Sequence, residues 1–393
     1  MFIILTFAVL FLLYGIFEQI NHLKRIKKIP IRIHVNGTRG KSTTTRLIAA
    51  GLREAGFKVL AKTTGTLPQL ILEDGKEIPI KRRGSANIIE QLKIFKEAAK
   101  RKVNALVLEC MAVSPELQFI SEHKMVKSTI GVITNVREDH LEEINPGLNN
   151  MAETLKLTIP QNGILVTAEK DYLPVFKEQA DKLKTKIIWA DPDYISSKII
   201  KKFNYMNFKE NVSIALQVNK LLGVKEEVAF KGMLKATPDP GALKVYRIIK
   251  ENKIIFFVNA FAANDRQSTL LIWENVKKIF DLSNLPIIGI INSRKDRALR
   301  AIQFAHILAE EISLSKIILV GPLSKLTERT FLKLKVPDNK MLNLGKITNI
   351  EEVLQSVLRS INDKNKVILI GLGNTKGVGQ NLIEYFNKFG EIK

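Results

Sequence analysis

The chain has 393 residues, which is too many for one compact hydrophobic core, so we expect two domains. Its apolar fraction of 46% excludes a long disordered region, and its single cysteine, Cys110, excludes an internal disulfide and a zinc site built on cysteine pairs. A net charge of +22 indicates either an anionic partner or a genome that favours lysine. Zinc-ligand spacings, aromatic RNA-binding motifs and a recognition helix are all missing, so we expect no nucleic-acid partner.

An apolar run opens the chain, from Phe2 to Phe17, and a basic cluster follows at residues 22–28. The run is at the short edge of a membrane span. It lacks a preceding basic region and a following small-residue cleavage site, so it predicts a transmembrane anchor over residues 1–22, not a cleaved signal peptide. The basic cluster then places the catalytic body on the cytoplasmic side of the cell membrane. The alternative is a helix buried in a partner or in the core.

Strand-like and helix-like segments alternate after this run. The strands expected are 31–35, 105–109, 129–134, 163–167, 254–258, 287–291, 316–320 and 367–370, and the helices are 42–55, 86–101, 269–280 and 298–312. This alternation predicts an α/β protein with mostly parallel sheets and helices on both faces. Two prolines and a glycine at 237–241 interrupt both periods. We therefore expect a central domain over residues 23–240 and a C-terminal domain over 241–393.

A glycine-rich loop follows the first predicted strand and runs directly into a helix. It reads Gly37-Thr38-Arg39-Gly40-Lys41-Ser42-Thr43-Thr44. Glycines let the backbone approach phosphate oxygens, and N–H groups at a helix N-terminus point at the anion. Lys41 would neutralise the outer phosphates and the Ser42 hydroxyl could bind Mg²⁺. Although the ordinary P-loop has glycine where Val35 stands, we expect ATP binding by residues 37–43.

This loop resembles that of the Mur ligase superfamily, which includes peptidoglycan amino-acid ligases and folylpolyglutamate synthase. Further segments resemble the family in the same order. Glu109 ends a strand where the family has a magnesium-binding glutamate, and residues 135–142 resemble its N-x-x-x-D-H-x-D run, with His140 as the histidine of a second metal site. Lys156 matches the lysine that Mur ligases carbamylate to complete that site.

The resemblance implies a fold, a catalytic set and a metal set. The fold would be a P-loop-containing Mur-ligase-like central domain and a Rossmann-like C-terminal domain, behind an N-terminal membrane helix. The catalytic residues would be Lys41, Glu109, His140 and Lys156, and two Mg²⁺ ions would be held by Ser42, Glu109, His140 and carbamylated Lys156.

Three matches to the family are partial. Asn211 stands where the family keeps an asparagine near the nucleotide base or ribose. Asp296 and Arg297 resemble its D-R turn, which would face the phosphates when the domains close. Ala242 replaces the arginine of the linker and removes a typical ATP contact.

Residues 108–113, the linker and the turn at 259–265 resemble one subgroup, the ligase subunit of poly-γ-glutamate synthases. That resemblance implies glutamate polymerisation through γ-carboxyl linkages, via an acyl phosphate, beside small membrane subunits that export the chain. The basic triplet at 81–83 is then expected to clamp carboxylates of the growing poly-γ-glutamate chain. Two alternatives stay open: a folylpolyglutamate-synthase-like ligase, and a membrane-tethered P-loop ATPase. The second needs an Asp where Glu109 ends its strand.

Overall fold

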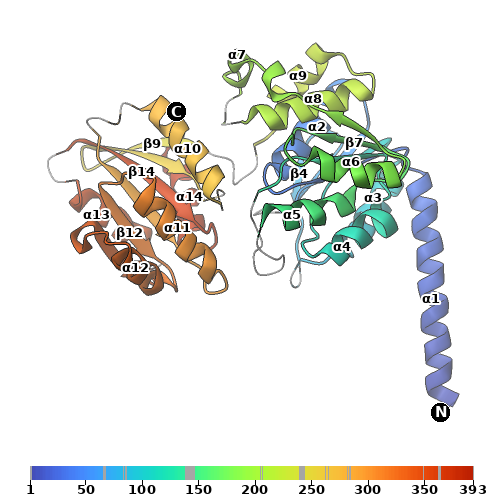
Figure 1. The fold of residues 1–393 in the computed structure, drawn as a ribbon, viewed down its shortest axis with the longest axis horizontal. Coiled ribbons are helices and arrows are strands. Elements are labelled where there is room, and N and C mark those ends of the chain that lie inside the picture. The colour runs from blue at the N-terminus through green and yellow to red at the C-terminus, as the bar shows by residue number, and fades with distance from the viewer. Residues whose placement is uncertain are drawn as a thin grey trace. The chain divides into compact units, whose positions relative to one another are not determined.

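The computed structural model describes residues 2–64, 68–82, 84, 86–137, 147–203, 205, 207–238, 244–261, 263, 265–280, 282, 285–347, 349–361 and 364–392. The chain forms two compact units, Met1–Asp239 and Pro240–Lys393. Each unit is a β-sheet with helices on its faces (Figure 1). The predicted α/β class is confirmed.

Helix α1, Phe2–Lys27, opens the first unit. The helical segment from Ile3 to Lys27 is long and apolar enough to cross a membrane. Its large apolar side chains are exposed as far as Ile20. From His22 the helix packs into the unit, and Ile26 is buried in a cluster with Phe95 of the neighbouring helix α3, Glu90–Arg101. The helix therefore continues beyond the apolar run and joins the body of the unit with its last turns.

The sheet of the first unit has the strand order β4-β3-β2-β5-β1-β6-β7-β8. The strands are β1 Ile31–Asn36, β2 Val59–Lys62, β3 Gln69–Ile71, β4 Glu77–Pro79, β5 Ala105–Glu109, β6 Ile130–Ile133, β7 Ile164–Thr167 and β8 Lys186–Trp189. The six from β2 to β8 in this order are parallel, and β3 and β4 add an antiparallel edge. Because β1 lies between β5 and β6, with Val35 opposite Glu109, the carboxyl ends of these three strands meet.

Helices cover both faces of this sheet. They are α2 Lys41–Glu54, α3 Glu90–Arg101, α4 Pro115–Ile120, α5 Leu148–Leu155, α6 Leu173–Lys182, α7 Ser197–Ile200, α8 Lys209–Leu221 and α9 Glu226–Leu234, with a π-helical turn η1 Ser121–Val126 and 3₁₀ turns η2 Lys156–Thr158 and η3 Pro192–Tyr194. Helix α3 begins four residues later than predicted, because the Asn87 side chain accepts the N–H of Ile89 at 2.9 Å and forms a turn instead.

A buried ion pair fastens the central strand of this unit. His34 Nδ1 of β1 lies 2.8 Å from Glu122 Oε2 of η1, and both side chains are at most 1% exposed. Burial by itself lowers the pKa of His34, but the neighbouring Cys110 and Glu122 side chains outweigh it and raise the pKa to about 10. The other Glu122 oxygen accepts the N–H and the hydroxyl of Ser128 at 2.8 and 2.9 Å.

We expect Glu122→Gln to lower the free energy of unfolding of this unit by about 3–5 kcal/mol at pH 7, because it leaves a buried imidazolium unpaired. His34 has a raised pKa, so its contribution is complete below its ordinary pKa of 6.5 and is lost as pH rises through about 10. The deficit of the variant should shrink over that range. Urea unfolding followed by Trp189 in a Trp273→Phe background measures it, with exposed Glu116→Gln as control. A deficit that stays constant from pH 7 to 10 would contradict this assignment.

The second unit has the strand order β13-β12-β11-β14-β10-β9-β15. The strands are β9 Val245–Lys250, β10 Lys253–Asn259, β11 Ile287–Asn292, β12 Lys316–Val320, β13 Met341–Gly345, β14 Lys366–Gly373 and β15 Glu391–Ile392. The five from β13 to β10 are parallel, and β9 and β15 are antiparallel additions. The sequence predicted none of β9, β13 and β15.

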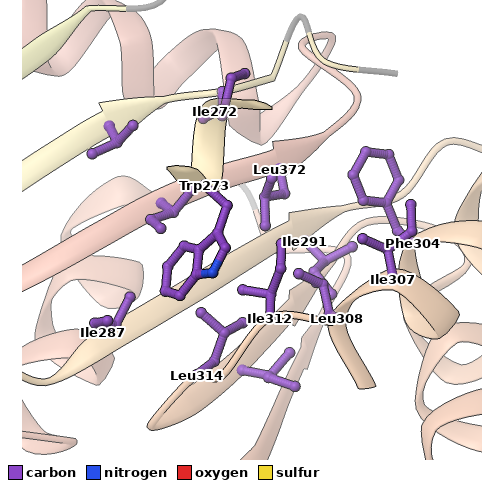
Figure 2. Packing of buried hydrophobic residues seen from close by; sticks show 14 of the residues in the cluster. Ile272, Trp273, Ile287, Ile291, Phe304, Ile307, Leu308, Ile312, Leu314 and Leu372 are labelled. Carbon is purple, nitrogen blue, oxygen red and sulfur yellow. The ribbon is translucent and has the colours of Figure 1, made fainter. Parts of the chain in front are cut away.

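Helices pack on both faces of this sheet as well. They are α10 Arg266–Ile279, α11 Ala298–Glu310, α12 Ser324–Lys333, α13 Ile350–Arg359 and α14 Val378–Phe389, with a 3₁₀ turn η4 Asp338–Lys340. Helix α10 starts earlier than predicted because Asp265 caps it, accepting the N–H and the hydroxyl of Ser268. Figure 2 shows Trp273 of α10 in the core of this unit beside Ile287 and Leu314.

Candidate active site

The glycine loop between β1 and α2 has a backbone that demands glycine at two positions. Gly37 and Gly40 have φ of 121° and 80°, in the region that side chains rarely adopt. Neither position has room for a side chain: a Cβ on Gly37 would lie 2.1 Å from Thr134 Oγ1, and one on Gly40 would lie 2.2 Å from Asn211 Oδ1. The loop is therefore packed against the residues after β6 on one side and against α8 on the other.

The segment after β6 holds the loop in place. The backbone N–H of Thr38 donates to the Asn135 carbonyl at 3.1 Å, and that of Arg39 donates to Asn135 Oδ1 at 3.0 Å. In return the Arg39 carbonyl accepts the Thr134 hydroxyl at 2.6 Å and the Asn135 amide at 3.1 Å. The loop is thus preorganised, but the N–H groups of Thr38 and Arg39 are already used and do not point at a ligand.

Hydrogen-bond donors that suit an anion lie one step further along, at the start of α2. The first intrahelical bond runs from the Thr44 N–H to the Gly40 carbonyl at 2.8 Å. The N–H groups of Lys41, Ser42 and Thr43 therefore have no acceptor within the helix, and they face out of its positive end. Lys41 Nζ donates to the Gly37 carbonyl at 2.6 Å and to the Thr38 carbonyl at 3.1 Å, which keeps its charge at the loop.

A carboxylate meets this helix end. Glu109, the last residue of β5, is 3% exposed, and its Oε2 accepts the Ser42 hydroxyl at 2.8 Å and the Thr64 N–H at 2.7 Å. A hydroxyl and a carboxylate are hard oxygen donors of the kind that Mg²⁺ prefers, and water and phosphate oxygens usually complete such a site. The pair that the sequence assigned to the first metal therefore lies together and fits a magnesium ion.

Thr64 was missed in the sequence, although the polar run after Lys62 at the end of a strand is a signal for it. Lys62 itself was missed too. Its side chain is fully buried, its Nζ lies 2.7 Å from Glu90 Oε1, and burial lowers its pKa against the opposing influence of Glu90. The Arg82 guanidinium donates to both oxygens of the same carboxylate, from Nε at 2.7 Å and from Nη2 at 3.1 Å. Arg82 is therefore bound within the protein, contrary to its expected role in a clamp for polymer carboxylates, and Arg83 lies outside the described residues.

The second metal site rests on two residues with different outcomes. His140 lies in 138–146, outside the described residues, and within the part of the chain that is described no cluster of three or more His, Cys, Asp or Glu residues could hold a metal. Lys156 begins η2, and its Nζ lies 2.5 Å from Glu153 Oε2. An ammonium in an ion pair is not the neutral amine that carbamylation needs. The structure thus gives Lys156 a partner of its own and no contact to Ser42 or Glu109.

Asn211 lies at the loop, as its predicted nucleotide role requires, but on the inner side. It is 4% exposed in α8, and its Oδ1 accepts the Thr44 hydroxyl at 3.3 Å. Asn211 also lies close to Gly40, so it packs against the glycine loop and the first turn of α2 and supports both.

In the second unit, Asp296 and Arg297 follow the carboxyl end of β11. Arg294 donates from Nε to Asp296 Oδ1 at 2.6 Å and pairs with its other oxygen, which lowers the pKa of Asp296 to about 2. Both members are exposed, so the turn is accessible to an anionic ligand. Asn259, the first residue of the predicted 259–265 turn, ends β10 and is 1% exposed, and among the described residues neither polar atom of its amide has a hydrogen-bond partner.

Comparison with known proteins agrees with this geometry. Residues 35–235 match the Mur ligase middle domain, and residues 245–389 match the poly-gamma-glutamate synthase CapB C-terminal domain. The fold is similar to a bifunctional folylpolyglutamate synthase/dihydrofolate synthase from Yersinia pestis complexed with AMPPNP and Mn ion, with a TM-score of 0.69 at 14% identity over 93% of this chain and 92% of that one. FolC of E. coli is similar at a TM-score of 0.65 and 13% identity, over 94% and 91% of the two chains.

Two relatives cover nearly the whole sequence. The capsule biosynthesis protein CapB of Bacillus anthracis is 45% identical over 98% of this chain and 82% of its own length, and the PGA synthase CapB of Bacillus subtilis (strain 168) is 40% identical over 99% and 98%. The fold and the loop define an ATP-dependent ligase that forms amide bonds, of the Mur ligase type. Within that class the chain belongs to the CapB family of poly-γ-glutamate synthases.

Proposed function

We propose that this protein uses ATP to join glutamate through its γ-carboxyl group, as the catalytic subunit of a membrane-associated poly-γ-glutamate synthase. The observation that carries the proposal is the contact of Ser42 with Glu109 at the N-terminus of α2. It supplies hydroxyl and carboxylate oxygens beside a helix end and a lysine that suit a nucleotide triphosphate. The chain that carries this site is 40% identical to the PGA synthase CapB over nearly its full length.

The residues divide the work of phosphoryl transfer. The N–H groups of Lys41, Ser42 and Thr43 and the ammonium of Lys41 bind and orient the phosphates of ATP, so that a carboxylate at the chain end attacks the γ-phosphorus in line. That step forms an acyl phosphate and releases ADP. The amino group of the next glutamate then attacks the acyl carbon, an amide forms and inorganic phosphate leaves. Ser42 and Glu109 would hold Mg²⁺, which supplies charge neutralisation at the phosphates.

The second metal site is proposed with His140 and carbamylated Lys156 as ligands. For this the ion pair of Lys156 with Glu153 must open and the amine must lose its proton. The side chain of Lys156 is 14% exposed, so it is partly shielded from water.

The remaining contacts are proposed from the second unit and from α8. Asp296 and Arg297 would meet the phosphates, and Asn211 would act at the nucleotide by holding the glycine loop. The hinge would lie at residues 237–241, between a body of residues 23–240 and a C-terminal domain of residues 241–393. The anchor would be residues 1–22, which include most of α1, with the body on the cytoplasmic side and small membrane subunits beside it.

Membranes that contain the full-length protein test the proposal when they are supplied with ATP, Mg²⁺ and labelled glutamate. We expect ADP release to depend on glutamate, and the label to appear in a polymer that a γ-glutamyl hydrolase degrades. Label that appears only on added folate would assign the protein to the folylpolyglutamate type. ATP hydrolysis that glutamate does not stimulate would assign it to a membrane-tethered ATPase.

A further inference from the structure

The base of α1 is held between α3 and η1. His22 Nε2 of α1 lies 2.7 Å from the Met125 carbonyl of η1, and its ring packs edge-on against Phe95 of α3 with centroids 5.1 Å apart. Arg32 adds a second tie, because its Nη1 donates to the Ile29 carbonyl at 2.7 Å and its Nε to the Lys127 carbonyl at 2.8 Å. Two elements far apart in the sequence, α3 and η1, are therefore fixed against α1 close to His22.

The length of α1 indicates where His22 would lie relative to a bilayer. Its exposed apolar side chains run from Ile3 to Ile20, a stretch of about 27 Å at 1.5 Å per residue. This is close to the roughly 30 Å hydrocarbon thickness of a bilayer. His22 lies only about 3 Å further along the helix axis. With Ile3–Ile20 in the hydrocarbon, the parts of α3 and η1 that contact His22 lie in the headgroup layer.

The two elements that contact the base of α1, α3 and η1, carry five exposed lysines on or directly after them, which we call the basic collar. They are Lys93, Lys96 and Lys100 of α3, Lys124 of η1 and Lys127 directly after it. Among the described residues none of these five side chains makes an ion pair. The acidic side chains of the same two elements are already used: Glu90 binds Lys62 and Arg82, Glu97 binds Arg101 at 2.6 Å, and Glu122 binds His34. The surface is therefore strongly cationic.

We propose that the basic collar binds the anionic headgroups of the leaflet from which α1 emerges, and so fixes the orientation of the first unit on the membrane. This inference rests on the proposed anchoring by α1. Anionic headgroups attract lysines that lie within about one Debye length, roughly 8–10 Å, of the surface. A unit tied only by α1 could rotate about the helix, whereas contacts on two further elements hold one face against the lipid.

A polyanionic product could also be attracted to lysines. The position of the collar favours lipid, because its lysines belong to the two elements that contact the base of the apolar helix, whereas Glu109 and the glycine loop lie at the carboxyl ends of β5 and β1. The two occupants give different results in the test.

The test uses the full-length protein with a fluorophore on Lys96→Cys, since Cys110 is buried. It is incorporated into vesicles of phosphatidylcholine, with or without phosphatidylglycerol, that carry a trace of lipid with a nitroxide on its headgroup. We expect stronger quenching with phosphatidylglycerol, which molar salt returns to the phosphatidylcholine level. The triple variant Lys93→Glu, Lys100→Glu and Lys124→Glu should lose the part of the quenching that depends on phosphatidylglycerol.

The matched control is Lys177→Glu, Lys186→Glu and Lys198→Glu, three exposed lysines on α6, β8 and α7, which should leave quenching unchanged. Equal quenching of the wild type in both vesicles, with flotation in both, would overturn the collar and leave the anchor standing. Failure to float with either vesicle would overturn the anchor and the collar with it. Quenching that responds to soluble poly-γ-glutamate and not to phosphatidylglycerol would assign the lysines to the polymer and overturn the proposal.

Discussion

Replacing Lys41 with alanine should lower the glutamate-dependent turnover of ATP by about 10²–10³-fold or more while the fold stays intact. The Lys41 ammonium donates to two loop carbonyls, of Gly37 and Thr38, and it is the charge that a transferring phosphoryl group would meet at the N-terminus of α2. Alanine removes the charge and leaves the backbone N–H groups, so binding of ATP should weaken less than turnover. The measurement is the initial rate of ADP release with and without glutamate.

Two controls separate this effect from damage to the fold. Lys177→Ala removes an exposed lysine from α6 and should keep the wild-type rate. The urea midpoint of Lys41→Ala, read at Trp189, should match that of the wild type within error, because Lys41 is only half-buried and its two acceptors can bind water instead. Glutamate-dependent ATP consumption that persists in Lys41→Ala would remove Lys41 from the mechanism.

The strand ends explain how much of the site the sequence could predict. An apolar run that ends in one carboxylate predicted β5 with its observed bounds, Ala105–Glu109. A run that ends at a glycine loop predicted β1 and the start of α2. Parallel strands place their carboxyl ends at one edge, so the closeness of Ser42 and Glu109 followed once β5 was a neighbour of β1.

Non-local pairings were beyond the reach of the sequence. The ion pairs of Glu90 with Arg82 and with buried Lys62 join three separate segments. No periodic pattern in the sequence indicates that these segments meet. The use of the Arg39 N–H by Asn135 depends on the conformation of two loops at once. Each of these contacts fills a hydrogen-bonding group of Arg82 or Arg39 that a motif had assigned to a ligand, whereas the Ser42 hydroxyl contacts Glu109, its expected partner at the metal.

Substitution of Glu109 by glutamine should separate activity from stability at the same position. The amide keeps the shape of the side chain and an oxygen that can accept the Thr64 N–H, but it loses the negative charge. If Glu109 binds Mg²⁺, the rate at saturating ATP should fall by about 10²–10³-fold, and the Mg²⁺ concentration needed for half of the remaining rate should rise. A titration of ATP turnover against Mg²⁺ measures both, and exposed Glu116→Gln should match the wild type.

The stability of the same variant decides between a catalytic and a structural carboxylate. Glu109 is 3% exposed, and in the described structure it accepts hydrogen bonds from Ser42 and Thr64 but makes no ion pair. Burying such a charge is costly, so the neutral amide should leave the urea midpoint unchanged or raise it. A site kept for function would thus lose activity and gain stability on the same substitution. A fall in the midpoint together with a wild-type Mg²⁺ dependence would make Glu109 a structural residue that holds the loop after β2 to the glycine loop.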